Sequence, residues 1–367
     1  EYAAWKKSHQ PFHWFAEYYG ILEGRGGFDV IIGNPPYVEY AKVKSDYEIP
    51  EYHTKECGNL YAYVIERGQQ IINAQGYWGY IVPLSGFSTA RMAPLQKLIS
   101  GRGNYFSSFD FRPSKLFEGV NMRLSICVST PNQAVQHSTS YLRWYSETRD
   151  TLFSNRVTYA VTAITKDGIP KLSTQSESSL WRKVSSPKRI RHSSVGSSSH
   201  TLYFHDAILY WIRATDFPPV HGDYISSHVK EVDFRTKPQL ELACSVINST
   251  LFYWWWTKGS NCRDLNVDEV LSFPIDLDAL NGPGVELLKK HKALMKDFMK
   301  NSEEKVRIQK QTGTVHYREF NPVRSKDLID EIDTLLAGHY GLSAEELDYI
   351  INYDIKYRMG SELEGGE

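Results

Sequence analysis

Short apolar runs separated by glycine, proline and polar breaks dominate the first third of the chain. The run Phe28–Ile32 is rich in β-branched residues and ends at Gly-Asn-Pro-Pro, which predicts a strand followed by a stiff loop. Apolar residues recur at helical spacing within Asn59–Asn73 and again around Ala93–Ile99. Three further strands are predicted, at Gly76–Val82, Phe106–Phe111 and Leu124–Thr130. The connector Pro113–Asn121 is short, so the last two strands are expected to be antiparallel neighbours.

The pattern changes from about Gln133 onward. Serine- and threonine-rich segments there contain short predicted strands at Tyr141–Tyr145 and Val157–Thr162. The last part is predicted to be helical, with an amphipathic helix over Val285–Gln311, a helix over Ser325–Leu336 that ends at Gly338, and a final helix opened by a capping box at Ser343–Glu346. These changes predict an α/β chain with three regions, residues 1–132, 133–280 and 281–367.

Composition narrows the class of protein. The chain has 367 residues, a hydrophobic content of 41% and a net charge of −1, so any binding to nucleic acid must use local patches. The four cysteines have no CxxC spacing and the 12 histidines form no ligand-spaced cluster, which predicts no metal site and favours a reducing, cytoplasmic location. No apolar run approaches the roughly 20 residues of a membrane helix, and no signal peptide is recognisable.

The loop Asn34-Pro35-Pro36-Tyr37 carries the candidate chemistry. It presents a neutral carboxamide, a carbonyl held stiffly by Pro35, and an aromatic ring. The amino group of a base such as adenine is a poor nucleophile because its lone pair is delocalised. Two acceptors, Asn34 Oδ1 and the Pro35 carbonyl, would hold its two hydrogens and localise the lone pair for attack on a methyl group. A base in a duplex must be flipped out to reach this loop, and Tyr37 is expected to stack on it.

This string closely resembles motif IV of amino-group methyltransferases that use S-adenosylmethionine, in which Asn-Pro-Pro-Tyr marks adenine-N6 enzymes. The resemblance covers most of the chain, since four other segments are similar to DNA adenine methyltransferases joined to restriction systems: YAYVIERG, GYWGYIVP, FEGVNMRLSICV and GHYGLSAEELDYI. It implies the C-terminal half of a Rossmann-like methyltransferase sheet, then a mixed α/β target-recognition domain and C-terminal helices. It also implies that Asn34 and Pro35 border the cofactor and that double-stranded DNA is the substrate.

The glycine-rich Phe-x-Gly-x-Gly turn of this family follows no predicted strand of the chain. The chain also begins at Glu1 and not at Met. We therefore expect a fragment, or a natural half that needs a partner subunit or a missing N-terminal half to complete its cofactor site. The free edge of Phe28–Ile32 is then expected to be covered by the N-terminal segment, a partner chain or a neighbouring copy.

Two segments of the second region are candidates for DNA contact. The basic cluster Trp181–His192, which includes Pro187 and runs into a Ser/Gly-rich stretch to Ser199, is either a phosphate-binding loop or a solvated linker; its candidate contacts are Lys188, Arg189 and Arg191. The turn after Trp254–Trp256 resembles target-recognition domains and supplies the candidates Lys258, Ser260, Asn261 and Arg263. The three tryptophans themselves are expected to pack in the core and not to stack on bases.

Two other functions are compatible with the same loop. Asn-Pro-Pro-Tyr also occurs in enzymes that methylate a protein glutamine or RNA, although the long aromatic-rich second region favours a DNA substrate. A specificity protein without catalysis is the other alternative, which the intact Asn34–Tyr37 string disfavours and the missing cofactor turn favours. Glu303-Glu304-Lys305 matches a carboxylate-x-lysine nuclease pattern, but we predict a solvated face of a charged helix there.

Overall fold

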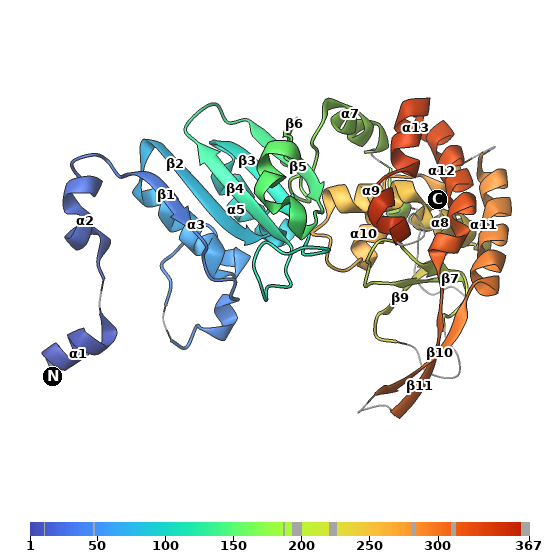
Figure 1. Cartoon of the computed structure of the whole chain (residues 1–367), viewed down its shortest axis with the longest axis horizontal. Coiled ribbons are helices and arrows are strands. Elements are labelled where there is room, and N and C mark those ends of the chain that lie inside the picture. The colour runs from blue at the N-terminus through green and yellow to red at the C-terminus, as the bar shows by residue number, and fades with distance from the viewer. Residues whose placement is uncertain are drawn as a thin grey trace. The chain divides into compact units, whose positions relative to one another are not determined.

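The computed structural model of the chain divides into two compact units, Glu1–Thr174 and Gln175–Glu367 (Figure 1). The structure describes residues 1–10, 12–46, 48–185, 188–192, 200–219, 226–280, 283–309 and 313–360.

A mixed six-stranded sheet forms the first unit, with the order β1-β2-β4-β3-β5-β6. Strands β1 and β2 are parallel, whereas β4 is antiparallel to both of its neighbours, β2 and β3. Strand β5 pairs in parallel with β3 and antiparallel with β6. The strands are β1 (Phe28–Gly33), β2 (Ile72–Pro83), β3 (Gly103–Phe109), β4 (Leu124–Thr130), β5 (Gln136–Leu142) and β6 (Ala160–Thr162).

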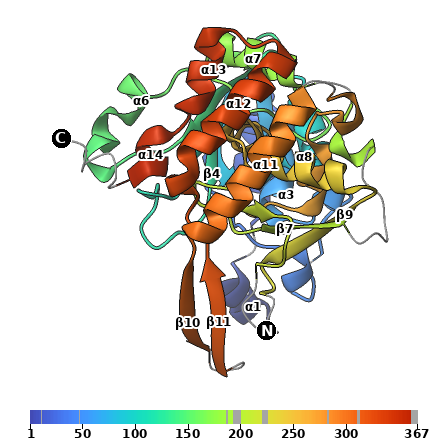
Figure 2. The ribbon, with the colours of Figure 1, turned by 90° about the vertical axis from the view of Figure 1, so that its right-hand side faces the viewer.

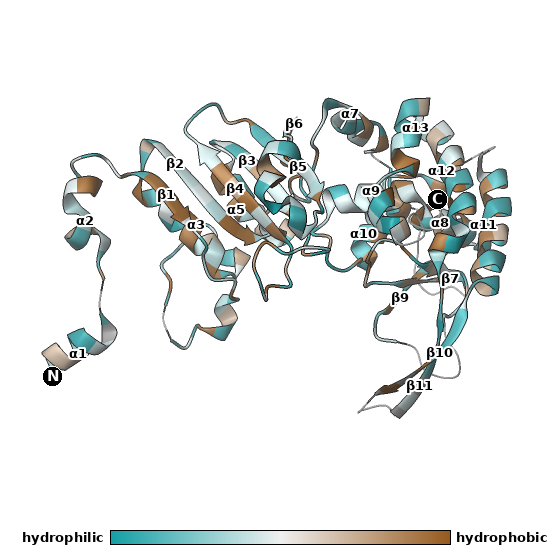
Figure 3. Cartoon of the chain, viewed as in Figure 1, coloured by the Kyte–Doolittle hydropathy of each residue, from teal (hydrophilic) through white to brown (hydrophobic). Residues whose placement is uncertain are grey.

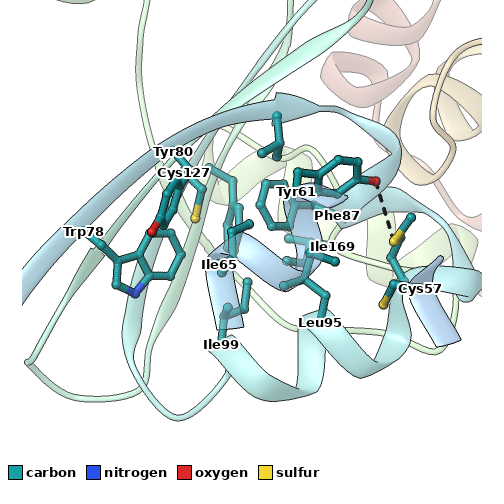
Figure 4. Close-up of a cluster of buried hydrophobic side chains, with 14 of the residues drawn as sticks. Cys57, Tyr61, Ile65, Trp78, Tyr80, Phe87, Leu95, Ile99, Cys127 and Ile169 are labelled. Carbon is teal, nitrogen blue, oxygen red and sulfur yellow. Dashed lines mark hydrogen bonds between the residues drawn. The ribbon is translucent and has the colours of Figure 1, made fainter. Parts of the chain in front are cut away.

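The main core of this unit lies between one face of the sheet and two helices. Alternate residues of β2, beginning with Trp78 and Tyr80, face the helices together with Phe106 and Cys127. Tyr61 of α3 closes the far end of this cluster and donates to the Met92 sulfur at 3.6 Å (Figure 4). The helices of the unit are α1 (Tyr2–His9), α2 (Trp14–Leu22), α3 (Leu60–Ile71), α4 (Ser85–Ser88), α5 (Ala93–Ile99) and α6 (Leu152–Asn155).

The opposite face of the sheet has a row of exposed apolar side chains. Strand register places Ile32, Gly79, Val128, Tyr105, His137 and Val161 side by side across the sheet. Ile32 is 82% exposed, Val128 42% and Val161 59%, and the apolar colour of β1 is visible in Figure 3. The rings of Trp14 and Tyr18 in α2 contact Phe28 at the start of β1. Among the described residues, the N-terminal segment therefore covers the start of the strand, and cover of the rest of the edge by a partner chain or a neighbouring copy stays a prediction.

Local sequence patterns predict most of this unit. The strand at Phe28, the helix after Asn59, the helix Ala93–Ile99 and the strand Leu124–Thr130 are confirmed, as is the antiparallel pairing of β3 with β4. The boundary expected after residue 132 differs from the structure, in which the first unit extends to Thr174. The physical reason is that β5 and β6 continue the hydrogen-bonded sheet of β3.

The second unit packs helices around a three-stranded sheet with the order β8-β7-β9. Helix α11 packs against both α8 and α12, and a two-stranded hairpin projects from these helices (Figure 2). The helices are α7 (Gln175–Val184), α8 (Lys237–Asn248), α9 (Thr250–Gly259), α10 (Val267–Ser272), α11 (Pro283–Lys300), α12 (Lys326–Tyr340), α13 (Ala344–Ile351) and α14 (Ile355–Met359). The strands are β7 (His200–His205), β8 (Ala214–Thr215), β9 (Val229–Phe234), β10 (Glu303–Gln309) and β11 (Gly313–Glu319).

The predicted helix Val285–Gln311 is wrong in its last part. Helix α11 ends at Lys300, and β10 pairs antiparallel with β11. The nuclease-like string at Glu303 therefore lies on a strand and not on a helix. Val306 and Ile308 alternate with charged residues, which is the period of a strand and not of a helix.

Two other expectations about the C-terminal region have different outcomes. Helix α12 continues to Tyr340 and ends at Gly341 with a φ of 63°, beyond the predicted end at Gly338. The capping box at Ser343 is confirmed, because its hydroxyl accepts from the Glu346 N–H while the Glu346 carboxylate accepts from the Ser343 N–H.

The boundary expected after residue 280 also differs from the structure, since α11 and α12 belong to the second unit. No helix in the described part of the chain is both long and apolar enough to cross a membrane.

Candidate functional site

The loop Asn34–Tyr37 follows β1 at the carboxyl ends of the parallel strands β1 and β2. This edge is where α/β sheets usually place ligand-binding residues. Asn34 and Pro36 are exposed, whereas Pro35 is buried and Tyr37 is half-buried. The loop therefore presents the carboxamide to solvent on a backbone that is fixed from beneath.

The Tyr37 hydroxyl fixes the position of Asn34. It lies 2.6 Å from Asn34 Oδ1 and 3.0 Å from the carbonyl oxygen of Ile81 in β2. Burial raises the pKa of Tyr37 to about 12, so the hydroxyl keeps its proton at neutral pH and can donate it. A carboxamide oxygen accepts two hydrogen bonds, so Asn34 Oδ1 can take one from Tyr37 and one from a substrate amine.

The segment just after this loop is anchored by a second set of contacts that sequence patterns did not predict. Glu39 forms an isolated β-bridge with Asn59, and the Leu60 N–H donates to the Val38 carbonyl at 3.0 Å. The Glu39 carboxylate also pairs with Arg91 at 2.6 Å. These partners are far apart in sequence, and a lone glutamate between Val38 and Tyr40 carries no local signal.

The long connection before α3 is tied down by a buried carboxylate. Glu66 of α3 accepts from the N–H groups of His53 and Thr54, each at 2.9 Å, and from the Thr54 hydroxyl at 2.7 Å. The side chain is 2% exposed. An acidic residue on the apolar face of a predicted helix was the available signal, and it points to loop anchoring and not to catalysis.

The basic cluster of the second unit is already paired with acids. Lys188 pairs with Asp276, and Arg191 pairs with Asp268 of α10 at 2.6 Å. Arg189 donates to the Ser272 carbonyl at 3.2 Å and is half-buried. Lys188 and Arg191 remain exposed, but their charge is partly neutralised by these carboxylates. Pro187 and the Ser/Gly-rich stretch 193–199 lie outside the described residues.

Two of the four candidates at the end of α9 and in the turn that follows it are buried. Lys258 has no exposed surface and its Nζ lies 2.7 Å from Glu177 Oε1. Ser260 is 7% exposed, and its hydroxyl accepts from the Cys262 N–H at 2.9 Å. A side chain without accessible surface cannot touch a phosphate or base edge, so the prediction for Lys258 is wrong, whereas the contact predicted for Ser260 stays a prediction. Both residues hold the turn in place.

The other two candidates of the turn are accessible. The Arg263 side chain is 78% exposed and lies 3.3 Å from Asp264, while the Asn261 carboxamide accepts from the Arg263 N–H at 2.9 Å. Asn261 and Arg263 precede α10, and the segment of Lys188 and Arg191 packs against the same helix. The structure thus brings the two sets of candidates to one short helix.

The tryptophan run behaves as expected for packing. Trp254 is fully buried and Trp256 is 2% exposed, and the Trp256 ring N–H donates to Glu269 at 3.1 Å. These two rings cannot stack on nucleic-acid bases. Trp255 is half-buried and contacts Phe273 edge-on.

Comparison with known proteins supports the resemblance to methyltransferases that was drawn from the loop. Residues 2–117 match the family described as Eco57I restriction-modification methylase. A putative type II restriction enzyme and methyltransferase from Methanocaldococcus jannaschii is 32% identical over 88 residues, which are 24% of this chain and 7% of that protein. The resemblance to restriction–modification methyltransferases, first drawn from Asn34–Tyr37, is therefore confirmed for the N-terminal part of the chain.

Two solved structures are similar at low identity. A modification subunit of a putative type I restriction enzyme from Vibrio vulnificus shares 12% identity, with a TM-score of 0.26, over 41% of this chain and 38% of that chain. The type IIG restriction endonuclease BpuSI shares 10% identity, with a TM-score of 0.30, over 88% of this chain and 54% of that chain. The chain spans well under two thirds of each of these relatives.

Proposed function

We propose that this chain, whose residues 2–117 match restriction–modification methylases, belongs to an adenine-specific DNA methyltransferase that uses S-adenosylmethionine. The observation that carries the proposal is the tethered Asn34. Its carboxamide is exposed at the carboxyl ends of β1 and β2, and Tyr37 holds its oxygen at 2.6 Å. All four cysteines are free and buried, which agrees with a reducing compartment, and we place the enzyme in the cytoplasm.

The loop would act by positioning and not by proton abstraction. When bound, S-adenosylmethionine supplies an electrophilic methyl group on a sulfonium. Asn34 Oδ1 would accept one hydrogen of the adenine amine and the Pro35 carbonyl the other, so that the nitrogen becomes pyramidal and its lone pair is no longer delocalised into the ring. As the new N–C bond forms, the bond from the methyl carbon to the sulfonium sulfur breaks, and the extra proton on the amine leaves to solvent. Because the hydroxyl of Tyr37 is anchored to β2, the acceptor at Asn34 does not need to reorganise as positive charge develops on the amine. We propose that the Tyr37 ring stacks on the flipped base.

Among the described residues, no glycine-rich turn of the kind that cradles this cofactor follows a strand. We propose that an N-terminal methyltransferase half or a partner subunit supplies it and docks on the first unit. Two observations support this. Among the described strands, β1 pairs with β2 alone, and its outer edge is therefore available for a further strand. The adjoining face also exposes Val30 and Ile32, which a soluble monomer normally covers.

We propose that the surface around α10 contacts DNA. Arg263 and Asn261 would reach base edges, where an exposed arginine or amide can read sequence. Lys188, Arg189 and Arg191 would contact phosphates without reading sequence, after Lys188 and Arg191 exchange Asp276 and Asp268 for the DNA backbone.

The decisive experiment measures the methylated product and the role of Asn34 together. The chain, supplied with its cofactor-binding half, is incubated with S-adenosylmethionine and duplex DNA, and the nucleosides are analysed by mass spectrometry. We expect N6-methyladenine. Asn34→Ala should slow the single-turnover methylation rate by about 10²–10³-fold, because loss of one preorganised transition-state partner costs about 3–4 kcal/mol. Its affinity for DNA should be unchanged.

Asn73→Ala is the matched control. Asn73 is a half-buried asparagine of the same unit, whose amide donates to Asp29 at 2.6 Å near the start of β1. This variant should keep the full methylation rate. An Asn34→Ala rate equal to the wild type would contradict the role of the loop, and methylation of protein or RNA instead of DNA would reassign the substrate.

A further inference from the structure

Three side chains that are distant in sequence meet inside the second unit. Asp216 directly follows β8, Glu241 lies on α8 and His291 lies on α11. One ligand atom from each lies within 4.8 Å of the other two. His291 Nε2 and Asp216 Oδ2 are 2.9 Å apart. None of these residues belongs to the candidate catalytic loop or to the surface around α10.

The three side chains are more buried than those of a surface ion pair. The His291 side chain is 1% exposed, that of Glu241 9% and that of Asp216 22%. Burying a carboxylate is costly unless hydrogen bonds or a cation compensate it. Within the described residues, the Glu241 carboxylate receives no hydrogen bond, and its ion-pair partner is Lys237 Nζ at 3.8 Å. The His291 ring is bonded at Nε2 alone, since Nδ1 has no partner in the described part of the chain.

We propose that Asp216, Glu241 and His291 bind one divalent transition-metal ion, of the zinc or manganese type. One imidazole and two carboxylates form a donor set that suits such ions, whose bonds to these atoms are about 2.0–2.2 Å long. Ligands of one ion lie at most about 4.4 Å apart at such bond lengths. The His291–Asp216 pair already meets this limit, and a small rotation of the Glu241 side chain brings in the third. The ion would take the position of the proton between Nε2 and Oδ2.

A second histidine–aspartate pair in the same unit has a lysine where the proposed site has its second carboxylate. His228 Nδ1 lies 2.8 Å from Asp206, but the third group there is Lys230, at 3.2 Å from the same carboxylate. An ammonium neutralises that aspartate and repels a metal ion. At His291 the third group is instead a buried carboxylate, so the local charge favours a cation.

The nearby cysteine does not belong to the donor set. The Cys244 thiol donates to the Ala214 carbonyl at 3.3 Å, and burial raises its pKa well above the usual range. It therefore stays protonated and is a poor ligand. Oxygen and imidazole donors then favour zinc or manganese over copper(I).

The site would connect the end of β8 to helices α8 and α11. Helices α8 and α11 also touch where the Ser245 hydroxyl lies 3.4 Å from the Leu287 carbonyl. His291 lies one turn beyond Leu287, on the buried side of α11. An ion held there would stabilise the packing of this unit and would not take part in methyl transfer.

The test titrates the full chain, freed of metal, with Zn²⁺ and with Mn²⁺. We expect one ion per chain by calorimetry. At a hundredfold excess over the dissociation constant the ion should raise Tm by about 5 °C or more. Glu241→Gln keeps the shape of the side chain but removes the charge, and His291→Gln removes the imidazole. Each should weaken binding at least tenfold, with the Tm shift measured against the same variant without metal.

His228→Gln is the matched control and should bind the ion as the wild type does. The proposal is overturned if the wild-type chain binds no stoichiometric ion at 100-micromolar metal, or if Glu241→Gln binds as tightly as the wild type. It is also overturned if His228→Gln loses the same binding. Should His291→Gln fail to fold, Glu241→Gln and the wild-type titration decide the question.

Discussion

Tyr37 joins the two parallel strands at the candidate site through its hydroxyl, which contacts Asn34 Oδ1 and the Ile81 carbonyl. Tyr37→Phe removes both contacts and keeps the ring. We expect the variant to lose about 1 kcal/mol of unfolding free energy and to methylate about tenfold more slowly, less than the loss in Asn34→Ala. A stacking role alone would leave the rate of Tyr37→Phe unchanged in single-turnover assays.

The Tyr37 hydroxyl should also make the unfolding free energy depend on pH. The pKa of Tyr37 is raised to about 12, from 10.0, by burial. A raised pKa means that the folded state holds this proton more tightly than the unfolded state. The stability it contributes is therefore present below pH 10 and lost as pH rises toward 12. The wild-type unfolding free energy should fall more steeply over this window than that of Tyr37→Phe, whereas Tyr77→Phe, an exposed control, should follow the wild type.

Lys258 is a structural residue, and its substitution should affect folding before it affects DNA. Its ammonium pairs with Glu177 at 2.7 Å and lies 5.2 Å from the centre of the Tyr353 ring. Lys258→Met leaves Glu177 buried without its cation, which typically costs about 3–5 kcal/mol. Lys188→Met, at an exposed pair, should change stability little. Denaturant unfolding of both variants checks this, and equal stabilities would show that the buried pair is dispensable.

At the level of the helices, the N-terminus of α9 is capped by a carboxylate from another helix. Asp333 of α12 accepts from the Thr250 N–H at 3.0 Å and the Leu251 N–H at 2.9 Å, the first two residues of α9. Asp333→Asn places an NH₂ group against one of these donors. An unsatisfied buried donor costs about 1–3 kcal/mol, so we expect the second unit to unfold at a lower denaturant concentration.

This loss should depend on pH. Burial raises the pKa of Asp333 from 3.8 to about 6, against the opposing effect of the two N–H groups. The folded state therefore binds this proton more tightly than the unfolded state. The contribution of Asp333 is present below about pH 4 and declines as pH rises to 6. The stability difference between the wild type and Asp333→Asn should shrink over this range, and a constant difference from pH 4 to 7 would contradict the shift.

At the scale of the whole molecule, the first unit holds an acceptor loop beside an open sheet edge. The chain alone should not bind S-adenosylmethionine measurably in calorimetry, because the described residues form no glycine-rich cradle. Binding should appear once the cofactor-binding half is added, with β1 covered. Micromolar binding by the chain alone would place the cradle within it, and the missing-half proposal would then be wrong.

Elements whose causes are local could be predicted from the sequence alone. A β-branched run stopped by two prolines specifies β1 and its loop, and helical spacing specifies α3 and α5. The capping box at Ser343 needs only residues three positions apart. The acceptor role that we propose for Asn34 also rests on residue types in one short string.

Features that depend on partners distant in the chain could be found only in the folded structure. The first unit ends at Thr174 because β5 pairs with β3, which no local pattern specifies. Lys258 is buried because Glu177 lies beside it, and Asp216, Glu241 and His291 meet only after α8, α11 and β8 pack. The physical reason is that burial and charge pairing belong to a packed environment, and a residue type reveals that environment only when its neighbours are close in sequence.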